Sequence, residues 1–179
     1  MTLRVWRRLF VVGFVVVLLQ VCALQQLVFL GAHPDIFLLM AVCAGLVAGP
    51  QLGALVGFVV GLVADIFMPT PYGLSALCYV LVAFGVGLVR PLQGDRAPHL
   101  FQVATGFVGS IGGTLLYEVL MALLGQPHLP RAELVDVVVV VSVANAILAV
   151  PAVWALRWIF ALPGRRLGRQ VAPAHGALR

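Results

Sequence analysis

Apolar residues fill most of this chain and are interrupted only by short polar segments. Five apolar runs extend over residues 9–30, 36–67, 74–89, 100–124 and 134–162. A helix needs about 20 mainly apolar residues to cross the hydrocarbon core of a bilayer. The pattern therefore predicts an all-α membrane protein built from apolar helices.

The second run is too long to be one membrane helix. Residues 34–67 as a single helix would reach about 51 Å, which exceeds the bilayer core. Gly49-Pro50 offers a break, because proline lacks a backbone donor and disfavours helix in the residue before it. We therefore predict a single six-helix domain over residues 1–162 and a basic, disordered cytoplasmic tail over 163–179. The predicted helices cover about 9–30, 35–48, 51–67, 73–90, 100–124 and 134–162.

The first run could also be a signal peptide. Arginines precede it, and Val21-Cys22-Ala23 is an acceptable cleavage site. However, the apolar run continues to Leu30, which is enough to span a membrane. We expect a retained helix.

The arginines predict the orientation, because cytoplasmic loops carry an excess of basic residues. With six helices and a cytoplasmic N-terminus, Arg131 alone falls outside. The other arginines then lie inside or near the inner helix ends: Arg4, Arg7, Arg8, Arg90, Arg96, Arg157, Arg165, Arg166, Arg169 and Arg179. Five helices would give a nearly even split. Both termini are therefore predicted to be cytoplasmic, in a multi-pass plasma-membrane protein.

The composition is typical of a membrane protein and includes few residues that could carry out catalysis. Charged residues make up 9% of the chain, against about a quarter in soluble domains. The net charge of +5 is explained by orientation in the membrane, so we expect no nucleic-acid partner. The three cysteines and four histidines have no metal-type spacing, and no catalytic motif is present. We therefore predict no enzyme activity, no metal and no cofactor.

The most informative pattern is a series of glycines in steps of four. It runs from Gly45 through Gly49, Gly53, Gly57 and Gly61 and ends in Asp65. Residues four apart share a helix face, and a face without side chains lets another backbone approach closely. The break at residues 49 and 50 leaves the last three glycines as the firm packing face. We predict that this face and Asp65 form a docking surface for another helix.

The carboxylates near the outer helix ends are the candidate polar residues. Asp65 is either a buried carboxylate paired with a neighbouring helix or partner, or a hydrated residue at a helix end. Asp35 is suited to the first turn of its helix. Glu118 is predicted to be partly buried, as a structural pin or, less favoured, in a proton relay with Asp35 and Asp65. Ser142 and Asn145 are expected to join helices.

Three segments resemble the rod shape-determining protein MreD family. They are PDIFLLM at 34–40, the glycine-rich helix ending in ADIF at 64–67, and PTPYGLSAL at 69–77. Asp35, Gly61, Asp65 and Gly73 match the family pattern, whereas Glu118 cannot be matched. The likeness in helix number and loop spacing covers nearly the whole chain.

The resemblance implies a fold and a set of partners. The fold would be a six-helix bundle similar to the substrate-binding subunits of energy-coupling-factor transporters. The protein would be a non-enzymatic scaffold of the bacterial elongation complex, in contact with membrane lipid. It would bind MreC directly and, through it, MreB, RodA and the penicillin-binding transpeptidase of RodA.

A second hypothesis is a vitamin-like solute-binding component of a transporter. Its pocket would lie near the outer face and be lined by Asp35, Asp65, Tyr72 and Glu118. Such pockets usually offer several convergent polar groups, and this chain offers few. A lipid flippase would need a hydrated path, for which the inner half has almost no polar residues.

Overall fold

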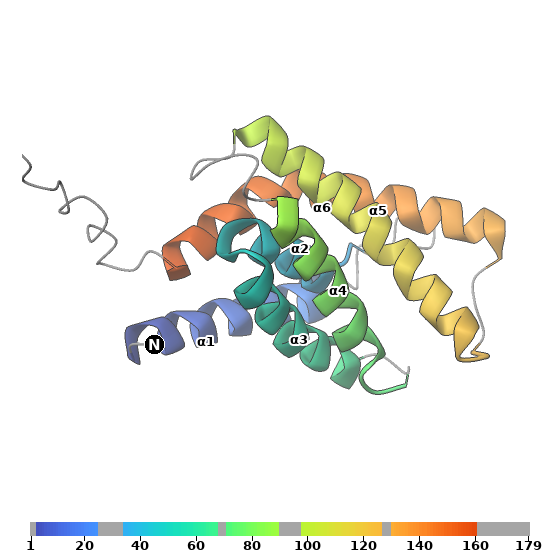
Figure 1. Ribbon diagram of the computed structural model, residues 1–179, viewed down its shortest axis with the longest axis horizontal. Coiled ribbons are helices and arrows are strands. Elements are labelled where there is room, and N and C mark those ends of the chain that lie inside the picture. Colours follow the sequence, from blue (N-terminus) through green and yellow to red (C-terminus); the bar gives the residue numbers. More distant parts are fainter. Residues whose placement is uncertain (1–2, 25–33, 68–70, 90–97, 127–129, 161–179) are drawn as a thin grey trace, which may run out of the picture.

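The computed structural model describes residues 3–24, 34–67, 71–89, 98–126 and 130–160. Within these ranges the chain is all-helical and contains no strand (Figure 1). The elements are α1 (Leu3–Leu18), a π-helical segment η1 (Leu19–Leu24), α2 (Ile36–Ala48), α3 (Pro50–Phe67), α4 (Leu74–Val89), α5 (His99–Leu123) and α6 (Arg131–Phe160). The predicted all-α class is confirmed.

Among the residues that the structure describes, three helices are long and apolar enough to cross a membrane. They lie at Pro50–Phe67, His99–Leu123 and Glu133–Phe160, while α2 and α4 are apolar but shorter. These are the helices of a membrane protein.

The helix bounds differ little from the predicted ones, except at the N-terminus. There α1 begins at Leu3, six residues before the predicted start, and passes into η1. The other observed bounds lie within three residues of the predicted ones. Residues 25–30 of the first predicted helix and the tail at 163–179 lie outside the described residues.

The predicted break after α2 is present. Gly49 has a φ of 86°, in the left-handed region that favours glycine, and its N–H donates to the carbonyl of Gly45 at 3.0 Å. Pro50 then occupies the first position of α3, where its missing donor costs nothing. The long apolar run therefore folds into two helices.

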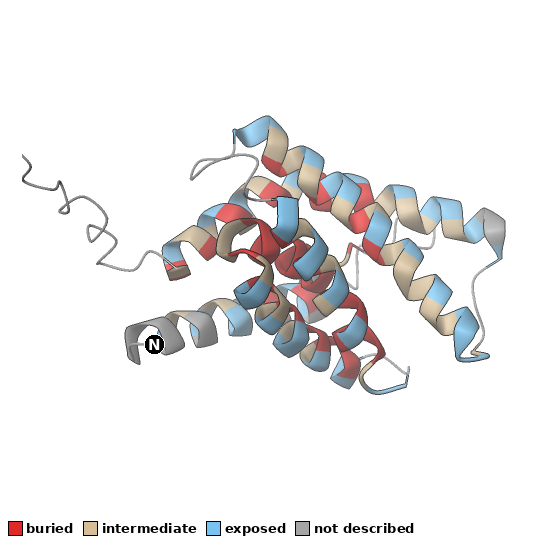
Figure 2. Cartoon of the chain, in the orientation of Figure 1, coloured by how far each residue is buried: buried red, intermediate tan, exposed pale blue. Residues whose placement is uncertain are grey.

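Helix α2 is the centre of the bundle. All its residues from Ile36 to Leu46 are buried, and it contacts α3, α4, α5 and α6. Figure 2 shows the buried residues concentrated on α2 and on the sides of α3 and α4 that face it. A helix that is apolar all round belongs in such a core. Because α3, α4, α5 and α6 all pack against α2, the start and the length of α2 determine where these four helices lie.

Candidate functional site

Asp65 fixes the start of α4. Its side chain is 1% exposed, and its oxygens accept hydrogen bonds from the backbone N–H groups of Gly73 at 2.8 Å, Ser75 at 3.0 Å and Ala76 at 3.4 Å. Ser75 and Ala76 belong to the first turn of α4 and Gly73 directly precedes it, so the carboxylate lies at the helix N-terminus, where the helix dipole favours an anion. The hydrated interpretation of Asp65 is therefore wrong. The carboxylate pairs with a neighbouring helix of its own chain.

Gly73 serves the same connection. Its φ of 95° is a conformation that other residues rarely adopt, and its N–H makes the shortest of the three bonds to Asp65. The hydrogen bond between these two residues thus joins the last turn of α3 to the start of α4.

Asp35 holds the start of α2 in a similar way. Its Oδ1 accepts from the N–H of Leu38 at 3.0 Å, as an N-cap, and its Oδ2 accepts from the hydroxyl of Tyr79 at 2.7 Å. Tyr79 lies on α4 and is buried. One carboxylate therefore caps α2 and ties it to α4.

The role of Gln20 was not predicted from the sequence. Gln20 is buried in η1, donates to the carbonyl of Pro34 at 3.1 Å and accepts from the N–H of Ile36 at 3.0 Å. These bonds attach the first helix to the start of α2. Its position among apolar residues was the available signal, since a buried amide needs partners.

The glycine face is covered by the chain itself. A Cβ on Gly53 would lie 2.6 Å from the Cα of Gly45, and one on Gly57 would lie 2.6 Å from the carbonyl oxygen of Tyr79. A Cβ on Gly61 would collide with the backbone of Ala76. The glycines thus pack α3 against α2 and α4. The prediction of close helix packing is correct, but the prediction that this face is open to a partner is wrong.

Other candidate polar residues lie on α5 and α6. The amide of Asn145 donates to Ser110 Oγ at 2.8 Å, which joins α6 to α5 as expected. Glu118 lies half-buried on α5, five residues before the helix ends, and its roles as pin or relay stay predictions. No cluster of three potential metal ligands occurs among the residues that the structure describes.

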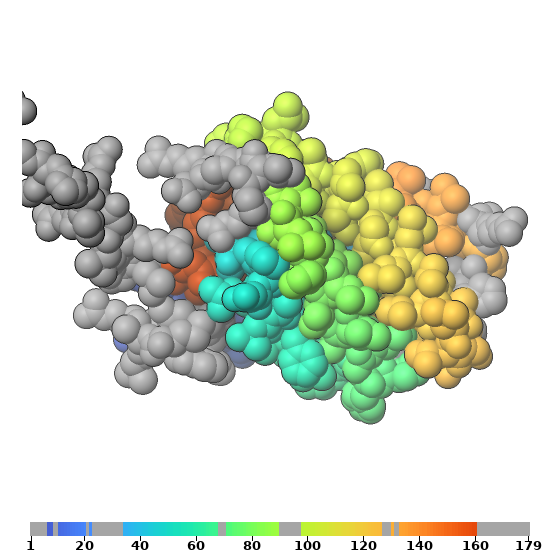
Figure 3. Space-filling view, in the orientation of Figure 1, coloured from blue at the N-terminus to red at the C-terminus, as the bar shows by residue number. Residues whose placement is uncertain are grey.

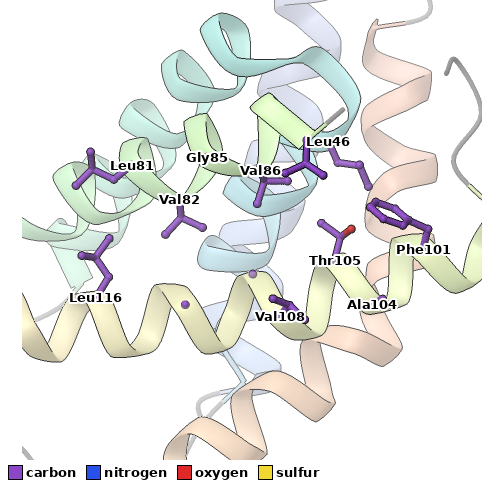
Figure 4. Close-up of a pocket in the computed structure, with 13 residues that line it drawn as sticks. Leu46, Leu81, Val82, Gly85, Val86, Phe101, Ala104, Thr105, Val108 and Leu116 are labelled. Carbon is purple, nitrogen blue, oxygen red and sulfur yellow. The ribbon is translucent and has the colours of Figure 1, made fainter. Parts of the chain in front are cut away.

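Helices α4 and α5 contact each other and lie side by side on one face of the molecule (Figure 3). An apolar groove of about 480 Å³ lies between them, and Leu46 of α2 also lines it. Figure 4 shows side chains of both helices directed into it. The lining residues are Leu46, Leu81, Val82, Gly85, Val86, Val89, Phe101, Ala104, Thr105, Val108, Gly109, Gly112 and Leu116.

Two glycines of this groove are uncovered. A Cβ on Gly85 or on Gly112 would have no atom of the described residues within 4 Å. Gly109, by contrast, packs against Val42 of α2. Both α4 and α5 pack against α2, and the groove lies between the parts of α4 and α5 that line it. Which glycines stay uncovered could not be predicted from the sequence.

In comparisons with known proteins, no family model, no curated protein and no solved structure matches this chain.

Proposed function

We propose that this protein is a non-enzymatic membrane scaffold of the bacterial cell-elongation complex, of the MreD type. In this proposal it crosses the plasma membrane six times, with both termini in the cytoplasm. It binds the transmembrane helix of MreC and, through MreC, joins MreB, RodA and the associated transpeptidase. By that route it helps control cell shape and peptidoglycan synthesis.

The observation that carries the proposal is the groove between α4 and α5. Its lining is apolar except for Thr105, and Gly85 and Gly112 leave two places where another backbone can approach. Helices associate in lipid through such close approaches, because packing replaces the hydrophobic effect there. The glycines of α3 are already used within the chain. The groove is therefore the surface that we assign to the MreC helix.

The motifs that resemble MreD support the assignment in a second way. Asp35, Asp65 and Gly73 hold the starts of α2 and α4, and α2 and α4 position the groove. A scaffold of this kind needs such residues for shape rather than for chemistry. Their roles fit a protein whose activity is binding.

The solute-binding alternative is less well supported. Of its four proposed lining residues, Asp35 and Asp65 accept bonds that cap helices, and Tyr72 is 85% exposed. The groove has the volume of a small-molecule pocket, but only Thr105 offers a polar side chain in it. A vitamin-like molecule carries several polar groups that would lack partners there.

Filling the groove tests the proposal. Gly85→Leu and Gly112→Leu should each abolish most co-purification of MreC from membranes while leaving the protein inserted and folded, because each side chain enters open space. Gly13→Leu is the matched control, since Gly13 on α1 is equally uncovered and lies outside the groove. Undiminished co-purification with both groove variants would contradict the proposed binding surface.

A further inference from the structure

A second surface of the protein joins the N-terminal part of α1 to the last turns of α6. The Nη1 of Arg8 donates to the carbonyl of Trp158 at 3.0 Å, and its guanidinium lies 4.6 Å from the centre of the Trp158 ring. Figure 1 shows the N-terminal end of α1 and the C-terminal end of α6 on the same side of the molecule. Cation–π stacking and the hydrogen bond thus fix the two helix ends together.

Two further positively charged residues lie next to this contact in the sequence. Arg7 and Arg157 are the sequence neighbours of the two bonded residues, and neither is buried. The bond to Trp158 uses one of the five N–H donors of the Arg8 guanidinium. The three arginines therefore occupy neighbouring backbone positions at these two helix ends.

Among the residues that the structure describes, the acidic side chains lie elsewhere, and Glu118 is near the C-terminal end of α5. On α6, Glu133 and Asp136 precede Arg157 by 21 residues or more, which is about 30 Å along a helix. Asp35 and Asp65 accept the hydrogen bonds that cap α2 and α4. Among the described residues, these four carboxylates therefore do not neutralise the three arginines.

The surroundings identify the environment of an anion bound at these arginines. Trp154 and Trp158 are both exposed beside these arginines, and tryptophan is enriched at the level of lipid headgroups. The exposed residues Val11, Phe14 and Val15 continue along α1 as an apolar surface. An anion bound here would have its charge at the arginines and an apolar surface directly beside it.

We propose that Arg7, Arg8 and Arg157 form a binding site for the phosphate headgroup of an anionic glycerophospholipid, whose acyl chains lie along α1. Guanidinium groups bind phosphate oxygens through paired, charge-assisted hydrogen bonds. The inference is independent of the partner proposed for the groove between α4 and α5. It adds a lipid that holds α1 against α6.

The test measures lipid binding by the full-length protein in detergent micelles. Phosphatidylglycerol should raise the thermal unfolding temperature of the native protein, whereas phosphatidylcholine should not. The double variant Arg7→Gln/Arg157→Gln should bind phosphatidylglycerol about 30-fold more weakly, the factor that corresponds to two arginines near a membrane surface. Arg8 stays native because it joins α1 to α6. Circular dichroism and elution volume report whether the variant is folded.

Two controls separate this site from general attraction to charge. Arg165→Gln/Arg166→Gln makes the same change in net charge outside the described residues and should keep most of the binding. Arg7→Lys/Arg157→Lys should bind more tightly than the glutamine variant, since charge remains while the paired bonds are lost. Equal losses in the two glutamine variants would overturn the site. So would equal stabilisation by free inorganic phosphate, which would show that the lipid is not the ligand.

Discussion

At the residue scale, the charged side chains inside this protein hold helix starts in place. Asp65 and Asp35 accept backbone N–H groups at the first turns of α4 and α2, where peptide dipoles stabilise a negative charge. Away from bulk water these donors would otherwise lack partners, which is costly. Each of these two carboxylates therefore holds the start of a helix.

Removing the Asp65 carboxylate should destabilise the fold. Asp65→Ala leaves buried N–H groups of α4 without acceptors, and we expect the free energy of unfolding to fall by about 3 kcal/mol. Reversible unfolding of the purified protein in mixed micelles measures this change. Asp136→Ala is the control, because Asp136 is exposed on α6 and its loss should cost less than about 0.5 kcal/mol. Equal stabilities of the two variants would contradict the capping role.

Part of this residue-level account could be predicted from the sequence. The N-terminal role of Asp35 was predictable, because an acidic residue directly before an apolar helix suits its first turn. The burial of Asp65 was one of two open interpretations, and its partners in α4 were not predicted. The role of Gln20 was missed, since its partners Pro34 and Ile36 lie across a connection whose path the sequence does not define.

At the element scale, glycine spacing controls how closely α3 approaches its neighbours. The period of four predicted a packing face correctly, because it depends only on helix geometry. The spacing alone could not predict which helix would pack against that face, because this depends on the path of the whole chain. The break at Gly49 and Pro50 was predictable because it follows from local backbone chemistry. The early start of α1 was not, because arginines at a helix end resemble a flanking segment.

A large side chain at Gly57 should separate α3 from α4. Its Cβ would lie 2.6 Å from the carbonyl oxygen of Tyr79, and a backbone atom inside a packed helix cannot move aside easily. We expect Gly57→Leu to lower the free energy of unfolding by about 3 kcal/mol or to prevent folding. Gly85→Leu, the same change at an uncovered glycine of α4, should leave unfolding nearly unchanged. A Gly57→Leu protein as stable as Gly85→Leu would contradict the packing.

At the scale of the whole molecule, the described helices pack around a buried central helix, α2. The short α2 contacts all four helices from α3 to α6, so the glycine-rich α3 is used to build the bundle. The described residues also leave an apolar groove between α4 and α5. The sequence predicted a docking surface on α3, but the fold uses the glycines of that surface to pack α3 against α2 and α4. The location of an open surface depends on which faces the fold has already covered.

The central claim is that a partner's transmembrane helix occupies the groove between α4 and α5, and site-specific photo-cross-linking in cells tests it most directly. A photoreactive amino acid would replace Val108, which lines the groove and is 65% exposed, or Leu55, which is 54% exposed on α3 outside the groove. We predict a cross-link to MreC from position 108 and none from position 55. A cross-link from position 55 and none from position 108 would contradict the claim.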